Sequence, residues 1–504
     1  MAAMGLLLAA MPMPLHANDV TFEDGGEHDF SDGAENDRWN VDVRDSDSDD
    51  PTTLNVLDGA WIDALNVWGT SLLEFQSGAT TNTLDTNDSS SATLDGGTYE
   101  GSVSARDDSQ ITILGGTFEG RVTANRTHIH VHAGTFEDRI RGFASGGVLT
   151  ASGQDIVAQG VRAEFGGTVN IEAGTYGGDG IYALHDSSTF NISGGTFTDQ
   201  VRSQDSSNLN ISGGIFQQRV SMQDNSIGNV TGGTLNGTVR VQHNAEATFS
   251  GGTINRLEAR DGPAQATLSD DVIVDDLRVM HDATMHIVGG TFTSAGSGLF
   301  VDNTGTANIS GGSFDMSIWA RDEGVINISG GEFNSLLSAE ADGVINLSDS
   351  ITVGSDLRLS GRGLLNLGQS RLTASSFTVN VSEDGRPTLQ LTLVDDMFDG
   401  EQLPFITVLG EDGLTLNTFD LVLNPEVTLG GGSWQEGSDL LLMTYNGVVS
   451  GTPALGEVSG VASYGDLLVE DGEVWLTNVN VVPEPGSLGL ASLGGLLLLV
   501  RRRG

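Results

Sequence analysis

The chain has 504 residues, among them 70 glycines and no cysteine, and only 6% of its residues are aromatic. This composition excludes a disulfide framework and argues against a conventional globule, and it favours a turn-dense, all-β repeat protein. The formal net charge of −46, with 68 acidic residues against 22 basic ones, argues against nucleic acid as a partner, because binding it requires a basic surface.

The first 17 residues, MAAMGLLLAAMPMPLHA, contain an apolar run that is followed by small residues. This pattern is typical of a secretory signal peptide with cleavage after Ala17, although the positively charged start is missing. A short buried strand is the alternative. We expect residues 1–17 to direct export.

Residues 18–50 are acidic and rich in turn-forming residues, and they end in the run from Asp45 to Asp50, DSDSDD. Alternating carboxylates can bind Ca²⁺, but a calcium loop also needs a glycine turn and a late glutamate, which this run lacks. We expect a solvated acidic segment that caps the first coil of the following repeats and covers an open sheet edge.

A repeated motif occupies residues 51–375 and is clearest at 191–201, NISGGTFTDQV. Its copies align on the second glycine or on the residue that replaces it, and they recur every 18 to 22 residues. The aligned positions are 59, 78, 97, 116, 134, 153, 174, 195, 214, 233, 252, 271, 290, 312, 331, 350 and 370. A period this regular predicts a solenoid, in which each coil stacks on its neighbours.

Within each repeat, apolar residues stand three and five positions before the aligned glycine, with a polar residue between them. This alternation predicts a strand with one buried face. The column three before the glycine runs from Val56 to Leu367, and Thr150 is its one polar member. The polar column predicts a side-chain ladder that contains Asn55, Asn170, Asn191, Asn210, Asn229, Asn308, Asn327, Asn346 and Asn366.

Two further columns follow the glycine. The aromatic column, two positions after it, contains Tyr99, Phe118, Phe136, Tyr176, Phe197, Phe216, Phe292, Phe314 and Phe333. The apolar column, six positions after it, contains Val103, Val122, Ile140, Val201, Val220, Val239 and Leu277. Together the columns predict an all-β fold, a single-stranded parallel β-helix of about 17 coils of about 19 residues each. We expect right-handed coiling, because left-handed coils usually repeat in sixes.

A turn column lies nine positions before the aligned glycine and contains Asp88, Asp107, Asn125, Asp186, Asp205, Asp224 and Asp322. Asp and Asn side chains close turns on their own backbone, which is sufficient cause for the column. A line of carboxylates that binds cations such as Ca²⁺ is the alternative. We expect no other cofactor.

Three histidines, His128, His130 and His132, alternate with Ile129 and Val131. The alternation puts the three imidazoles on one outward face of a strand. Two of them could share a metal ion, but no further ligand is identifiable from the sequence. We therefore predict no metal site here.

The period is lost near residue 375. From 376 to 480, apolar runs at 388–394, 403–409 and 440–445 are separated by Gly, Asp and Asn turns. This pattern predicts antiparallel strands in a separate β-rich domain, or in a cap on the end of the solenoid. The region resembles the C-terminal β regions of secreted, autotransporter-like proteins, but it carries no specific motif.

The tail at 483–504 has three parts: the tripeptide Pro-Glu-Pro at 483–485, an apolar run from Leu488 to Val500, and three arginines at 501–503. At about 1.5 Å per residue, a helix over 486–500 is short for a bilayer of roughly 30 Å. It predicts a marginal transmembrane helix. The arginines keep the C-terminus in the cytoplasm and leave everything upstream outside.

This three-part tail resembles the PEP-CTERM sorting signal of Gram-negative bacteria. The resemblance implies export through the Sec machinery, processing by an exosortase at the inner membrane, and delivery to the cell surface or the extracellular matrix. It covers less than a twentieth of the chain, so it implies an address and no activity. The matching residues are Pro483, Glu484, Pro485, Arg501, Arg502 and Arg503.

Two functions compete for the repeat region. Uniform repetition favours a non-enzymatic, rigid acidic solenoid that acts in adhesion, in biofilm structure or in association with extracellular polysaccharide. The alternative is a polysaccharide lyase or glycoside hydrolase, because many right-handed β-helices are such enzymes. A hydrolase needs two carboxylates at working separation, and the visible pairs, at 107–108 and 270–271, both fall in expected turns.

Any groove that binds an acidic polysaccharide would need local positive charge, because the net charge of the chain repels polyanions. The one locally arginine-rich stretch contains Arg121, Arg139, Arg141 and Arg162, near the irregular coils at 134–174. We expect a binding groove, if the chain has one, in this stretch.

Overall fold

A computed structural model of the chain describes residues 18–31, 39–45, 50–184, 187–293, 298–368, 370–380, 385–394, 404–411, 414–426, 438–446, 449–451, 453–459 and 461–481. The predicted signal peptide at 1–17 and the predicted sorting signal with its transmembrane helix at 483–504 lie outside these residues. Across the described ranges, no helix has the length and apolar character needed to span a membrane.

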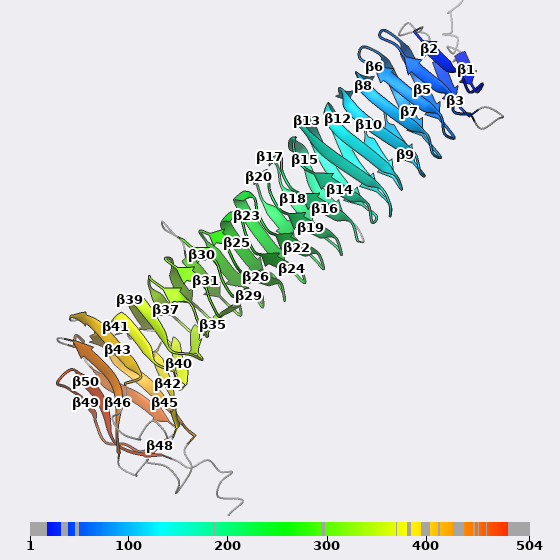
Figure 1. Cartoon of the computed structure of the whole chain (residues 1–504). Coiled ribbons are helices and arrows are strands. Elements are labelled where there is room, and N and C mark those ends of the chain that lie inside the picture. The colour runs from blue at the N-terminus through cyan, green and yellow to red at the C-terminus, as the bar shows by residue number, and fades with distance from the viewer. Residues whose placement is uncertain are drawn as a thin grey trace, which may run out of the picture. The chain divides into compact units, whose positions relative to one another are not determined.

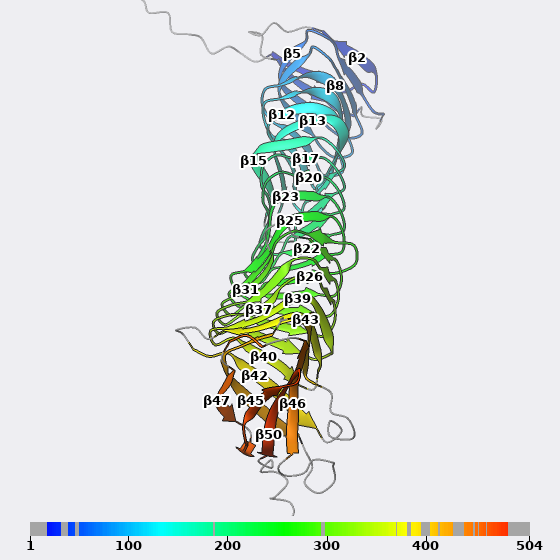
Figure 2. The same ribbon diagram turned by 90° about the vertical axis from the view of Figure 1, so that its left-hand side faces the viewer.

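The chain divides into two compact units, residues 1–217 and 218–504. All named elements in both units are β-strands, and together the described strands form about 18 coils of a parallel β-solenoid. The predicted all-β, parallel β-helical fold is therefore confirmed. In Figure 1 the strands of successive coils of the first unit lie side by side, and in Figure 2 the same coils appear as stacked turns of the chain.

The strands of the first unit are β1 Asn18–Phe22, β2 Glu27–Phe30, β3 Trp39–Val43, β4 Thr53–Val56, β5 Trp61–Val67, β6 Leu72–Gln76, β7 Thr80–Thr86, β8 Ser91–Tyr99, β9 Val103–Arg106, β10 Gln110–Phe118, β11 Val122–Asn125, β12 His128–Phe143, β13 Val148–Glu164, β14 Thr168–Ile171, β15 Thr175–Leu184, β16 Thr189–Ile192, β17 Thr196–Phe197, β18 Val201–Ser203, β19 Asn208–Ile211 and β20 Ile215–Phe216.

The strands of the second unit are β21 Val220–Met222, β22 Ile227–Val230, β23 Thr234–Gln242, β24 Glu246–Phe249, β25 Thr253–Arg260, β26 Gln265–Leu268, β27 Ile273–Val274, β28 Leu277–Met280, β29 Thr284–Ile287, β30 Thr291–Phe292, β31 Gly298–Asp302, β32 Thr306–Ile309, β33 Ser313–Phe314, β34 Ser317–Ala320, β35 Val325–Ile328, β36 Glu332–Phe333, β37 Leu337–Ala339, β38 Val344–Leu347, β39 Ile351–Ser360, β40 Leu364–Gly368, β41 Leu372–Asn380, β42 Thr388–Val394, β43 Ile406–Glu411, β44 Leu414–Leu416, β45 Thr418–Glu426, β46 Ser438–Asn446, β47 Ala454–Ser459, β48 Val461–Ser463, β49 Leu467–Glu470 and β50 Glu473–Val481.

The predicted apolar columns line the core. In the motif at 191–201, Ile192 is buried and pairs in parallel with Ile171 of the preceding coil and Ile211 of the next. Each polar residue between two inward residues therefore faces outward. One assignment was wrong: Thr150 does not enter the core, because the unbroken pairing of β12 with β13 puts Thr150 opposite the exposed His130 and Ala151 opposite Val131, so that Ala151 is the buried member of the column.

The aromatic column forms continuous stacks inside the coils. Phe118 lies between Tyr99 and Phe136, with ring centroids 4.4 Å and 4.6 Å away and nearly parallel planes. The second unit repeats the arrangement with Phe292, Phe314 and Phe333. Burial raises the pKa of Tyr99, and its hydroxyl donates a hydrogen bond to the Gly96 carbonyl at 3.1 Å. Such rings contribute packing energy beyond the area they bury.

The predicted asparagine ladder is present in part, as two separate runs, while Asn55 donates instead to Glu27 and Asp29 of the preceding coil. The Asn191 amide donates to Asn170 Oδ1 at 2.8 Å and accepts from Asn210 Nδ2 at 2.8 Å. In the second unit a separate ladder joins Asn308, Asn327, Asn346 and Asn366, at distances from 2.8 to 3.2 Å. An amide carries both donors and acceptors, so one side chain can bond to the coils above and below it.

The turns also follow the predicted columns. Gly195 has φ +91°, and a Cβ on Gly194 would collide with the Glu172 carbonyl oxygen of the preceding coil, so both positions need glycine. In the Asx column, Asp88, Asp107, Asp205, Asp224 and Asp322 adopt positive φ between 55° and 59°. These values agree with a role in closing the turn. Asn125 differs, because the residue with positive φ in its turn is the next one, Arg126. Asp186 lies outside the described residues.

Two predicted boundaries do not coincide with a change in strand pairing. Before residue 51, strand β3 pairs in parallel with β1 and β5, and its Val41 and Val43 are buried, so this segment belongs to the solenoid and is not only a solvated cap. After residue 375, β42 pairs in parallel with β40 and β45, and β43 with β41 and β46.

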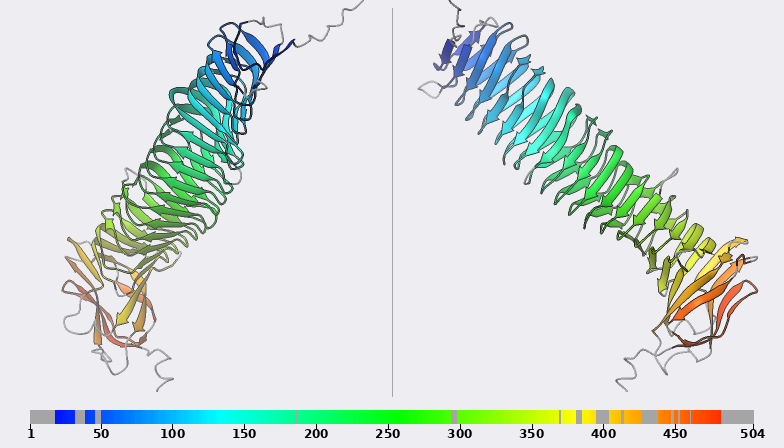
Figure 3. Two further views of the ribbon diagram at one scale, coloured as in Figure 1. Left: turned by 45° about the vertical axis from the view of Figure 1, so that its right-hand side comes forward. Right: turned by 180° about the vertical axis from the view of Figure 1, so that it is seen from behind.

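The predicted antiparallel arrangement was therefore wrong for residues 388–394 and 406–411. Among the described strands, antiparallel pairing is confined to β50, which pairs with β46, β48 and β49. These last strands are orange to red in Figure 3. Alternating apolar residues look alike in a solenoid coil and in a hairpin, because both bury one strand face.

Candidate functional site

The candidate site lies on the third strand of successive coils in the first unit. Strand β11 pairs in parallel with β9 and with the last part of β12. Val103, Val122 and Ile140 point into the core. Because side chains alternate between the two faces of a strand, the next residues face outward and form two rows that run from coil to coil. One row consists of Ser104, Thr123 and Arg141, and the row beside it consists of Arg106, Asn125 and Phe143.

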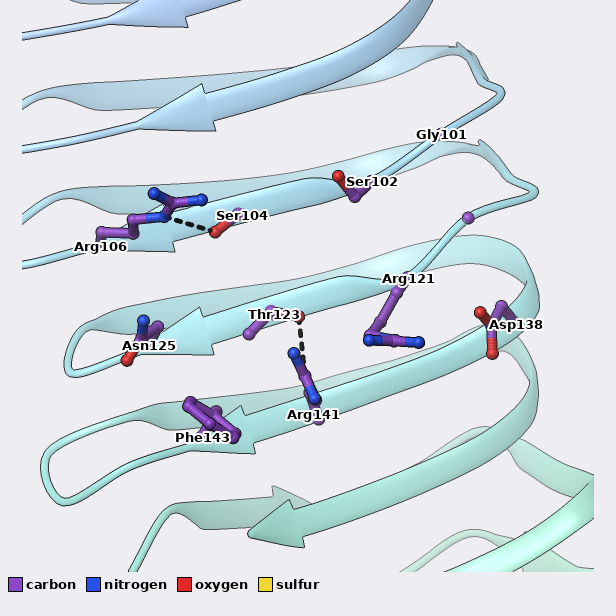
Figure 4. Close-up of a pocket in the computed structure, with 11 residues that line it drawn as sticks. Gly101, Ser102, Ser104, Arg106, Arg121, Thr123, Asn125, Asp138, Arg141 and Phe143 are labelled. Atoms are coloured by element: carbon purple, nitrogen blue, oxygen red, sulfur yellow. Dashed lines mark hydrogen bonds between the residues drawn. The ribbon is translucent and has the colours of Figure 1, made fainter. Parts of the chain in front are cut away.

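A pocket of about 450 Å³ lies over these rows. Figure 4 shows the polar side chains around it, including those of Arg121 and Arg141, which approach the same space from two neighbouring coils. The pocket is lined by Gly101, Ser102, Ser104, Arg106, Gly120, Arg121, Thr123, Asn125, Asp138, Arg141 and Phe143. Three arginines and a single carboxylate give this pocket a positive charge on a protein whose net charge is −46.

Most charges around the pocket are already neutralised. Arg141 donates from Nε to Thr123 Oγ1 at 2.9 Å and from Nη1 to Glu164 Oε2 at 3.2 Å. Arg106 Nη2 lies 3.2 Å from Asp85 Oδ1. The one carboxylate of the lining, Asp138, accepts hydrogen bonds from the backbone nitrogen and Nε of Arg139.

Arg121 is the exception. Its Nε is buried and has no hydrogen-bond partner, and no ion pair of its guanidinium occurs among the described residues. A buried donor without a partner costs free energy, so the site is incomplete as it stands. An anion that accepts from this guanidinium would complete it.

The pKa of Arg141 reports the electrostatic state of the pocket. Burial of the guanidinium and repulsion from Arg121 lower this pKa from its ordinary value, and the Glu164 carboxylate partly offsets both effects. Two like charges in a partly desolvated site produce a positive potential that favours an anion.

An aromatic pair borders the pocket. The Phe143 ring centroid lies 4.7 Å from Arg141 Cζ, and the Phe165 ring meets Phe143 edge-on at 5.2 Å. Phe165 is 53% exposed, although it is a large apolar residue. Exposed aromatic rings beside polar groups are typical of binding surfaces.

The arginine-rich stretch predicted from the sequence is brought together only in part. Arg121 and Arg141 line the pocket. Arg139 and Arg162 do not line it. Arg139 is engaged by Asp138, and Arg162 Nη1 lies 3.5 Å from Glu164 Oε1. Arg106 and Phe143 were missed by the sequence reasoning. The coil spacing could have found them, because 106, 125 and 143 occupy one column.

The other candidate residues form no site in the described part of the chain. His128, His130 and His132 are all exposed on β12, and the rings of the first two are 6.4 Å apart. Across the described residues, no group of three or more His, Cys, Asp or Glu side chains could hold a metal ion. In the acidic run, Asp45 accepts hydrogen bonds from the Thr70 backbone and hydroxyl, and residues 46–49 lie outside the described residues.

The second unit carries arginines whose charges are largely matched. Glu258 lies 2.8 Å from Arg240 Nε, and Asp302 lies 2.8 Å from Arg321 Nε. Phe300 stacks on Trp319 at 4.6 Å, but Arg321 covers its ring at 4.4 Å. Arg278 lies over the same Phe300 ring, and its Nε is, like that of Arg121, buried without a hydrogen-bond partner. Unlike Arg121, Arg278 has an acidic neighbour, because its Nε lies 3.7 Å from Asp276 Oδ2.

Neither a protein-family model nor a curated protein matches this chain.

Proposed function

We propose that this chain is a non-enzymatic, exported surface protein whose solenoid associates with extracellular polysaccharide and contributes to adhesion or biofilm structure. The observation that carries the proposal is the pocket beside Arg121, a positive and partly desolvated site on a strongly acidic protein. Stacked coils offer long, regular surfaces that suit contact with a polymer.

The address in the proposal comes from the tail. The tripeptide at 483–485, the apolar run and the arginines at 501–503 support recognition by an exosortase after Sec-dependent export, with transient anchoring in the inner membrane. The mature protein would then reside at the cell surface or in the extracellular matrix. Right-handed coiling of the solenoid is also part of the proposal, because its period is not built from sixes.

The alternative is a polysaccharide lyase or glycoside hydrolase. Hydrolysis needs a pair of carboxylates on either side of the scissile bond, about 5 to 9.5 Å apart. In the described pocket the lining includes one carboxylate, Asp138, and Arg139 already neutralises it. The lining therefore favours binding over turnover.

A panel of polysaccharides tests binding and turnover together. The purified protein is incubated with neutral, carboxylated and sulfated polymers, and both bound polymer and newly formed reducing ends are measured. Binding without release of reducing ends is expected. Release of reducing ends, or unsaturated products absorbing in the ultraviolet, would overturn the non-enzymatic proposal.

The tail has its own test. In a bacterium that carries an exosortase, replacing Pro483, Glu484 and Pro485 together with alanine is expected to leave the protein in the inner membrane at its full length. The measurement is membrane fractionation with mass analysis of the C-terminus. Alanine at Gly486, Ser487 and Gly489 is the matched control. Normal release of the tripeptide variant would argue against sorting by this signal.

A further inference from the structure

Resting on the proposed function, we infer that the pocket beside Arg121 binds the anionic group of an acidic polysaccharide, a carboxylate or a sulfate, and that Arg121 is the residue that pairs with it. The ligand is thus one charged sugar within a polymer. The proposal rests on three observations: the unsatisfied guanidinium, the surrounding hydroxyl donors and the adjacent exposed ring.

The guanidinium of Arg121 has the chemistry that such a group requires. Its planar fork can donate two parallel hydrogen bonds to a carboxylate or a sulfate. Arg139 and Arg141 are engaged by Asp138 and Glu164, so these acids do not compete for Arg121. Arg121 lines the pocket, and among the described residues no acid is paired with its guanidinium, so its charge is left for a ligand.

Neighbouring groups suit a sugar. Thr123 Oγ1 accepts a hydrogen bond from Arg141, and a hydroxyl that accepts one bond still has its own hydrogen to donate. Ser102 and Asn125 also line the pocket and can bond to ring hydroxyls. Phe165, half exposed beside Phe143, offers an apolar surface to the carbon-bound hydrogens of a sugar ring.

The charge of the whole chain restricts the ligand further. Sixty-eight acidic residues repel a polyanion over much of the surface, whereas the lining of the pocket brings three arginines together with one carboxylate. A polymer can place one charged sugar in the pocket while its flanking sugars stay in solvent, away from the acidic surface.

The test compares full-length protein with two variants of equal charge. Arg121→Gln removes the proposed partner. Arg219→Gln removes an exposed arginine at an equivalent position, because Arg219 stands immediately before the buried Val220 just as Arg121 stands immediately before the buried Val122. Binding to immobilised polygalacturonate, sulfated dextran and neutral dextran is measured at low and at physiological salt. Matching unfolding curves for both variants establish that the fold is kept.

The expected result is a loss of at least about tenfold in affinity for polygalacturonate, sulfated dextran or both in Arg121→Gln, because a charge-assisted bond is lost. Arg219→Gln should stay close to the wild type, and neutral dextran should bind no better than the blank. If Arg121→Gln binds only polygalacturonate more weakly, the anion is a carboxylate, and if it binds only sulfated dextran more weakly, the anion is a sulfate.

Two outcomes separate the inference from the proposed function. Binding of an acidic polymer that is equal in the wild type and in Arg121→Gln would overturn the pocket assignment and leave the surface function standing. Failure of the wild type to bind any polymer of the panel would overturn both. The variant Arg121→Lys gives a further check, since it keeps the charge but loses the fork and should bind with intermediate affinity.

Discussion

Replacing Phe118 with alanine is expected to lower the free energy of unfolding by about 3–5 kcal/mol. The ring is fully buried and stacks between Tyr99 at 4.4 Å and Phe136 at 4.6 Å. Alanine would leave a cavity and remove both ring contacts. Because a coil in a solenoid is stabilised mainly by the coils next to it, the loss weakens the coils on both sides.

Urea unfolding followed by circular dichroism measures this loss. Leu114→Ala is the matched control, since it shortens an apolar side chain on the same strand, β10, but at a position that is 42% exposed. The control should change the free energy of unfolding by no more than about 0.5 kcal/mol. Equal losses in the two variants would show that the aromatic stack is not what holds these coils together.

The aromatic stack also explains why so much of the fold could be predicted from the sequence. In a parallel solenoid each inward residue contacts its equivalents in the coils above and below, so one kind of side chain recurs at one position. Phe197 and Phe216 stack in this way at 4.7 Å. Asn191 joins its equivalents for a related reason, because an amide can donate to the coil on one side and accept from the coil on the other.

Prediction failed where a coil departs from the common length. Gly153 was aligned with the turn glycines, but Gly134 lies opposite Ile156, so the coil carries extra residues before its turn. A glycine is recognisable in the sequence, whereas the register is decided by which apolar residue can fill the core. Ala151 fills it here and Thr150 stays outside.

The binding pocket was predictable only in outline. Its arginines are conspicuous in a chain without lysine, and Arg121 and Arg141 do line the pocket. Which charges are neutralised could not be predicted, because Arg141 and Glu164 are 23 residues apart and meet only through the strand register. The absence of a partner for Arg121 is likewise a property of the folded chain.

Replacing Glu164 with glutamine is the second change with a large expected effect, a loss of about 3 kcal/mol in the free energy of unfolding. The Glu164 side chain is only 10% exposed, and its two oxygens lie 3.2 Å from Arg141 Nη1 and 3.5 Å from Arg162 Nη1. Glutamine has nearly the same shape but no charge. It would leave two largely buried guanidinium groups without the carboxylate that neutralises them.

The same substitution separates stability from binding at the pocket. Without Glu164, Arg141 joins Arg121 as an uncompensated cation, so affinity for an acidic polymer should rise while stability falls. Asp342→Asn is the control of equal charge, because its partner Arg362 is exposed and water screens that pair, so stability should change little. Urea unfolding and polygalacturonate binding are measured on the same samples. A stable Glu164→Gln protein, or one that binds polygalacturonate more weakly, would contradict the assignment of Glu164 as the group that limits positive charge in the pocket.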